Sequence, residues 1–131
     1  MKDNRMKIFS LTFLLLLFVG SEVFAGPVNL AVASDGQEQD ANICEQAARA
    51  PYFLFFDGHG VFLESVQNPA KDLKGGAGSS ASEFLAERGV KTVIAGSFGD
   101  KMRQALQEYH IEYLEKKGIT SVVVQEMLKK Q

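Results

Sequence analysis

Residues 28–34 show some alternation and are rich in apolar residues, and a period of two in residues 61–66 would put Val61, Leu63 and Ser65 on one face and Phe62, Glu64 and Val66 on the other. A period of two places successive side chains on opposite faces, so both segments are predicted to be strands. Residues 52–57 form an aromatic and apolar run that is typical of a buried strand. Gly58-His59-Gly60 stands between the second and third of these strands in chain order and predicts a hairpin.

The spacing of apolar residues changes to that of helices after residue 75. Ser80 and Glu83 have the spacing of a capping box, which predicts a helix start, and Gly89 supplies a helix end. Ser121 is expected to cap a last helix. The remaining expected elements are a short helix over 43–48, a strand over 90–95, a helix over 100–109 and a strand over 111–114. The residues expected on buried helix faces are Met102, Ala105, Leu106, Tyr109, Val124, Met127 and Leu128.

The predicted order of elements is β, short α, β, β, α, β, α, β, α. A hairpin followed by strand–helix–strand crossings favours an α/β domain with helices on both faces of its sheet. We therefore expect a three-layer α/β/α fold around a mixed, mostly parallel five-stranded sheet. Right-handed crossovers would bring the turns that follow the strands to one edge of this sheet.

The first 25 residues have the features of a secretory signal peptide. Lys2, Arg5 and Lys7 precede an apolar run over residues 8–19, and Ala25 suits the last position before a cut. This run is shorter than the ~20 residues of a membrane-spanning helix. We expect cleavage after Ala25, which leaves one domain over residues 26–131 in the periplasm or outside the cell; an uncleaved membrane anchor is the alternative.

The charge of the chain argues against a nucleic-acid partner. Three of its 14 Lys and Arg and two of its 16 Asp and Glu lie in residues 1–25, so residues 26–131 carry a net charge of −3. They contain no basic cluster. Cys44 is the one cysteine, so no internal disulfide forms, and its thiol is free, paired to another chain or bound to a ligand.

Two glycine-rich turns are the main candidates for a binding site. Each is predicted to open a helix, where unpaired N–H groups and a partial positive charge favour anions, and glycine permits close approach. The alternative is that these glycines only make tight turns. The candidate binding residues in the two turns are Gly76, Ala77, Gly78, Ser79, Ser80, Gly96, Ser97, Phe98 and Gly99. Asp35, at the end of the first strand, would position a ligand or simply form a turn.

The order and spacing of several segments resemble the dinitrogenase iron-molybdenum cofactor biosynthesis family, which includes NifX-like and NifB C-terminal-like proteins. The matching segments are residues 30–36, 49–53, 68–69, 76–78, 83–90, 93–96 and Gly99. The resemblance implies a ribonuclease H-like fold. It also implies noncovalent binding of molybdenum- or iron-containing sulfide clusters by a carrier or assembly protein.

One segment departs from the pattern of the family. Family members often carry His-Phe-Gly where this chain has Gln46-Ala47-Ala48, so an imidazole that could ligate a metal is missing. Cys44 could supply a thiolate instead, with a pKa lowered by Arg49. The guanidinium of Arg49 could also pair with an anionic ligand, unless it forms a surface ion pair with Glu45.

The sequence favours an exported, non-catalytic protein that binds an anionic metal–sulfur cluster. Two alternatives stay open. One is an interaction module that has lost its metal ligand, as the replacement at residues 46–48 suggests, and that binds a protein partner. The other is a small metal-dependent phosphate-ester hydrolase in which Asp35, Asp100 and Glu64 hold metal ions.

Overall fold

The computed structural model describes residues 26–130. The predicted signal peptide and its cleavage site therefore lie at or outside the edge of the described residues. The elements are β1 (Val28–Ser34), the 3-10 helix η1 (Ala47–Arg49), β2 (Tyr52–Asp57), β3 (Phe62–Gln67), α2 (Ala77–Glu87), β4 (Thr92–Ala95), α3 (Asp100–Glu108), β5 (Glu112–Glu115) and α4 (Thr120–Lys129). Their order is the predicted one.

The five strands form one mixed sheet in the order β3-β2-β1-β4-β5. The pairs β1–β2 and β2–β3 are antiparallel, whereas β1–β4 and β4–β5 are parallel. The prediction of a mostly parallel sheet is therefore wrong. β2 returns along β1, and the hairpin reverses the chain again into β3, so one side of the sheet is antiparallel.

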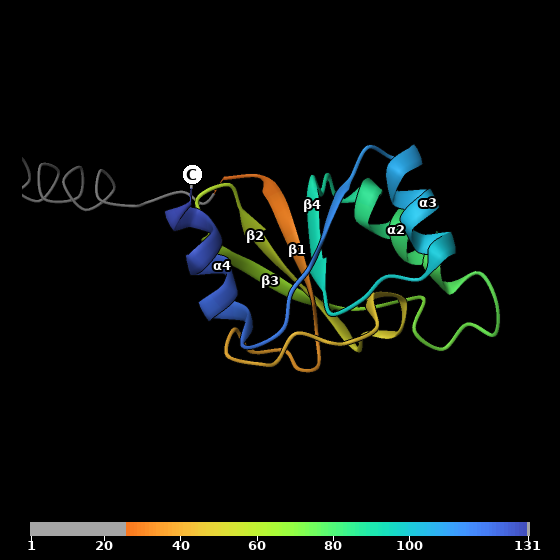
Figure 1. The fold of residues 1–131 in the computed structure, drawn as a ribbon, viewed down its shortest axis with the longest axis horizontal. Coiled ribbons are helices and arrows are strands. Elements are labelled where there is room, and N and C mark those ends of the chain that lie inside the picture. The colour runs from red at the N-terminus through yellow and green to blue at the C-terminus, as the bar shows by residue number, and fades with distance from the viewer. Residues whose placement is uncertain (1–25, 131) are drawn as a thin grey trace, which may run out of the picture.

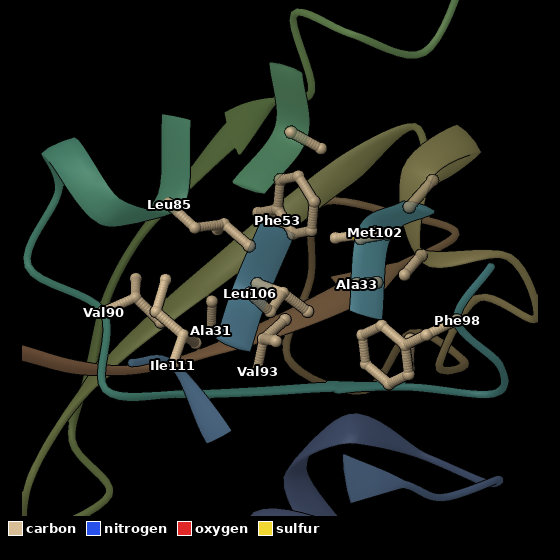
Figure 2. Close-up of a cluster of buried hydrophobic side chains, with 14 of the residues drawn as sticks. Ala31, Ala33, Phe53, Leu85, Val90, Val93, Phe98, Met102, Leu106 and Ile111 are labelled. Carbon is tan, nitrogen blue, oxygen red and sulfur yellow. The ribbon is translucent and has the colours of Figure 1, made fainter. Parts of the chain in front are cut away.

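Helices cover both faces of the sheet, with α2 and α3 on one face and α4 on the other (Figure 1). The predicted three layers are confirmed. In β1, Ala31 and Ala33 face α2 and α3, while Leu30 and Val32 face α4. Because both faces are covered, β1 is apolar at successive positions. Figure 2 shows the larger cluster, in which Phe53 and Val93 of the sheet lie near Leu85, Met102 and Leu106 of the helices.

Both predicted serine caps are wrong. Helix α2 begins at Ala77, three residues before Ser80, and its N-cap is Gly76 in the left-handed region, with φ of 73°. Helix α4 begins at Thr120, whose hydroxyl donates to the carbonyl of Ala41 at 2.9 Å. In each case a glycine or a tertiary contact sets the helix start, and no side-chain cap forms.

Three further expectations have different outcomes. The helix expected over residues 43–48 is only the single turn η1. Tyr109 is 45% exposed, so it does not share the buried face of Met102 and Leu106. Gly89, with φ of 79°, follows the C-cap of α2 and ends this helix as predicted. Among residues 26–130, no helix has the length and apolar character needed to cross a bilayer.

Candidate functional site

A cleft with a volume of about 490 Å³ lies where the starts of α2 and α3 meet η1. Three chain segments line it. They are the η1 segment with Gln46, Ala47, Ala48 and Arg49, the start of α2 with Ala77 and Gly78, and the β4–α3 turn with Ser97, Phe98, Gly99, Asp100, Lys101 and Met102. Pockets of a few hundred Å³ are the usual size for small-molecule ligands.

The two helix starts that line the cleft are in direct contact. A Cβ atom added to Gly78 would lie 2.9 Å from the Cβ of Met102 and 3.0 Å from its amide nitrogen. Only a residue without a side chain lets α2 approach α3 this closely. The two glycine-rich turns, separated by about twenty residues in the sequence, therefore meet at one place.

At the start of each helix, the first few backbone amides have no hydrogen bond within the helix, because they come before the first amide that bonds to a carbonyl four residues earlier. That bond joins the amide of Ser80 to the carbonyl of Gly76 in α2, and the amide of Arg103 to the carbonyl of Gly99 in α3. The amides over residues 77–79 and 100–102 thus have no carbonyl partner in the preceding helical turn. Two helix N-termini on one cleft give it the character of an anion site.

The part of the cleft lining that η1 supplies is fixed to the β4–α3 turn by backbone pairing. Gln46 and Ser97 form a parallel bridge, in which the amide of Ala47 donates to the carbonyl of Ser97 at 3.1 Å. The hydroxyl of Ser97 donates to the carbonyl of Glu45 at 2.9 Å. These bonds hold residues 46–48 against the cleft.

Arg49 stands at the end of η1 and connects the cleft to the loop before α2. Its Nη1 donates to the carbonyls of Lys71, at 2.8 Å, and Leu73. The expected alternative, an ion pair of Arg49 with Glu45, is wrong: Arg49 is in none of the salt bridges among residues 26–130, and the carboxylate of Glu45 lies 3.8 Å from Nζ of Lys117 instead. Arg49 is thus bonded to the segment that precedes the glycine-rich turn, while the residue remains exposed at the cleft.

Lys101 adds a second exposed cation to the lining and was missed by the sequence analysis. The neighbouring Asp100 accepts a hydrogen bond from Arg103, one turn later on α3. This bond, together with the charge of Asp100, raises the pKa of Arg103. The only signal in the sequence for Lys101 was its position in the first turn of a helix that follows a glycine-rich turn.

The structure divides the predicted site residues into two groups. The predicted residues that line the cleft are Arg49, Ala77, Gly78, Ser97, Phe98 and Gly99; those outside its lining are Asp35, Cys44, Gly76, Ser79, Ser80 and Gly96. Gly96 has a structural reason to be glycine, because an added Cβ would lie 2.7 Å from Cα of Glu45. Its amide donates to the carbonyl of Cys44 at 2.8 Å.

Asp35 and Cys44 lie together at the end of β1, beside the cleft lining. The amide of Asp35 donates to the carbonyl of Asn42 at 3.0 Å, which closes a turn. Cys44 is half-buried and its thiol donates to the carbonyl of Gln46 at 3.7 Å. Burial, and then a hydrogen bond with Asp35, raise the pKa of this thiol. The expectation that Arg49 lowers the pKa of Cys44 is therefore wrong.

The carboxylates considered for a metal-dependent hydrolase do not form a cluster. Glu64 on β3 pairs with Arg88 at 2.7 Å, and Asp100 pairs with Arg103. Asp35 belongs to the turn after β1. Throughout residues 26–130, no three side chains of His, Cys, Asp or Glu are grouped so that they could hold a metal ion.

Comparisons with known proteins agree with this architecture. The sequence profile of the family described as dinitrogenase iron-molybdenum cofactor matches residues 28–130. A search of curated protein sequences returns no match. Among solved structures, the apo form of the orange protein from Desulfovibrio gigas is 28% identical with a TM-score of 0.73, and the match covers 82% of this chain and 92% of that one.

Two more distant structures share the fold. A provisionally assigned NifB protein from Thermotoga is 23% identical, with a TM-score of 0.66 and coverage of 78% of this chain and 88% of that one. A provisionally assigned dinitrogenase from Methanocaldococcus jannaschii is 11% identical, with a TM-score of 0.55 and coverage of 80% and 91%.

Proposed function

The chain belongs to the dinitrogenase iron-molybdenum cofactor family, and from that premise we propose that it is a non-catalytic carrier of an anionic metal–sulfur cluster. The observation that carries the proposal is the meeting of two helix N-termini at one cleft. The cluster, containing molybdenum, iron or both, is the cargo of the protein.

The donor chemistry of the cleft fits such a cargo through its outer atoms. The lining offers backbone amides, the guanidinium of Arg49 and the ammonium of Lys101, all of which donate hydrogen bonds. Sulfide and oxo atoms on the outside of an anionic cluster accept them. The lining contains no thiolate and no imidazole, and its one carboxylate, Asp100, is paired with Arg103. The cluster would therefore be held mainly by charge and hydrogen bonds.

The proposed location follows from the first 25 residues of the sequence. A basic head, an apolar run and Ala25 before the expected cut support export to the periplasm or the cell exterior. The carrier would take up or release its cluster there.

Anaerobic titration with tetrathiomolybdate, a molybdenum–sulfur dianion, tests the proposal. We expect the full chain, purified without oxygen, to bind it with a defined stoichiometry by visible absorption and molybdenum analysis. The absence of uptake for tetrathiomolybdate, molybdate and iron–sulfur species would contradict the proposal. If a protein partner nevertheless bound at the cleft, the interaction module would be the better interpretation.

Variants that remove one positive charge identify where on the protein tetrathiomolybdate binds. Arg49→Gln and Lys101→Gln each remove a cation from the lining, so each should weaken binding about tenfold, the worth of one charged hydrogen bond. Lys91→Gln is the matched control, because Lys91 stands just before β4, at the end of the sheet opposite the cleft. Equal affinities for all three variants would place the anion elsewhere.

A further inference from the structure

Asp57, at the end of β2, binds the backbone at the beginning of the described chain. Its Oδ2 accepts a hydrogen bond from the amide nitrogen of Gly26 at 2.9 Å. Its Oδ1 accepts bonds from the amides of His59, at 2.8 Å, and Val61, at 2.9 Å. Asp57 is only 3% exposed, and it is covered by its own hairpin turn and by Gly26.

This carboxylate is ionised without a cationic partner among residues 26–130. The bonds from Gly26 and then Val61 lower the pKa of Asp57. The salt bridges found in the described part of the chain do not include it. A covered anion held only by neutral donors gains most from a partner with a positive charge.

Gly26 is also the residue that the sequence predicts to begin the processed protein. We propose that cleavage between Ala25 and Gly26 converts the Gly26 nitrogen into an α-ammonium group that forms an ion pair with Asp57. Hydrolysis breaks the peptide bond between these residues; water gives its hydroxyl to the Ala25 carbonyl and a proton to the Gly26 nitrogen. The new amine then takes one more proton from solvent.

The local backbone already presents Gly26 to Asp57. Gly26 precedes Pro27, which restricts it to extended conformations. Val28, two residues later, is paired with Asp57 in the β1–β2 register. The nitrogen therefore needs no rearrangement to become a charged partner. Processing would fix the start of β1 to the hairpin at the end of the sheet opposite the cleft.

The surroundings of Asp57 allow the pH dependence to be assigned. His59 is the titratable residue whose charge acts on Asp57. The neighbours from β1, β4 and α4 that line the small cavity beside it are uncharged; they are Asn29, Leu30, Thr92, Val124, Met127 and Leu128.

The α-amine sets the upper limit, and Asp57 the lower limit, of the pH range in which the ion pair stabilises the protein. The pairing raises the pKa of the α-amine above about 7.7–8.0, so its contribution to stability is present below that pH and lost as pH rises through the folded-state pKa. The contribution of Asp57 is present above its ordinary pKa near 3.8 and lost at lower pH.

The experiment uses the full chain, exported by a bacterial host with residues 1–25 in place. Intact mass of the recovered protein should correspond to a start at Gly26. In a variant with one alanine inserted between Ala25 and Gly26, cleavage after Ala25 leaves the Gly26 amide donor in place but moves the charged amine away. A cut after the inserted alanine is disfavoured, because the large Phe24 would then occupy the −3 position.

We expect the insertion to lower the midpoint of thermal unfolding by several degrees at pH 6.5, and by less at pH 9.5. In an Asp57→Asn background the insertion should have no effect, because the acceptor charge is gone. His59→Gln serves as control: in this variant the effect of the insertion on the unfolding midpoint should still be smaller at pH 9.5 than at pH 6.5. A different start of the mature chain would overturn the proposal, as would equal midpoints with and without the insertion.

This proposal rests on the proposed export but not on the cluster cargo. Asp57 lies at the opposite end of the sheet from the cleft, so Asp57→Asn should keep its affinity for tetrathiomolybdate. Failure of metal binding and failure of the terminal ion pair are therefore separate results.

Discussion

Gly78 of α2 and Met102 of α3 are packed so closely that the glycine has no room for a side chain. The Cβ of an alanine at residue 78 would lie 2.9 Å from the Cβ of Met102 and 3.2 Å from its Cα. Met102 is almost fully buried, so neither atom can move away without shifting α3. The contact fixes the distance between the two helix starts and so the width of the cleft.

Gly78→Ala should therefore destabilise the protein. Alanine favours a helix over glycine by about 1 kcal/mol, so helix propensity alone predicts the opposite sign. The overlap with Met102 costs about 1–3 kcal/mol, and we expect it to prevail. Urea unfolding measures the net change, and tetrathiomolybdate affinity should fall in parallel because the helix starts move apart.

Gly75→Ala is the control for this substitution. No atom lies within 4 Å of a Cβ added to Gly75, and its φ is outside the left-handed region. This variant should be as stable as the parent or slightly more stable. A Gly78→Ala protein that gained stability like Gly75→Ala would show that α2 and α3 are not in the contact described.

The elements of the fold could be predicted because each follows from local periodicity. The apolar richness of β1 and the aromatic run in β2 were enough to place both strands. The direction of β2 relative to β1 could not be predicted, because it depends on the path of the irregular connection over residues 35–51. The start of α2 was misplaced because Gly76, in a left-handed conformation, supplies the N-cap in place of Ser80.

The candidate site was predictable in outline for a similar reason. Glycines before two helices mark two N-termini, but only the tertiary structure shows that Gly78 contacts Met102. Gly96 belonged to the same sequence motif, yet its amide donates to the carbonyl of Cys44 and is not available to a ligand. Lys101 could not be distinguished from other surface lysines until the cleft was known.

Cys44 should be a slowly reacting thiol. Burial, and then its hydrogen bond with Asp35, raise its pKa above the ordinary value of 9.0, so the thiolate that reacts with iodoacetamide is scarce at neutral pH. We expect the alkylation rate to increase with pH up to and beyond 9. Asp35→Asn removes a group that raises the pKa and should accelerate the reaction at pH 8 several-fold.

Asp40→Asn is the control for Asp35, since it removes an exposed carboxylate from the same loop. Its alkylation rate should equal that of the parent. A rate that is already maximal at pH 7 would reveal a thiolate, and would return Cys44 to consideration as a metal ligand.

A backbone amide at the start of α3 can be removed by a single substitution. Asp100 is the first residue of α3 and follows Gly99, whose φ of −70° and ψ of 160° suit the residue before a proline. Proline is well tolerated at the first position of a helix, where its missing N–H breaks no helical bond. Asp100→Pro should therefore fold normally, yet it lacks one donor at the cleft.

Asp100→Ala is the matched control, because it removes the same carboxylate and its bond with Arg103 but keeps the amide. If backbone donors hold the anion, Asp100→Pro should bind tetrathiomolybdate about tenfold more weakly than Asp100→Ala, as expected for the loss of one hydrogen bond to a charged group. Circular dichroism should show the same helix content in both. Equal affinity for the two variants would mean that side-chain charge alone attracts the anion, and that the start of α3 is not part of the binding site.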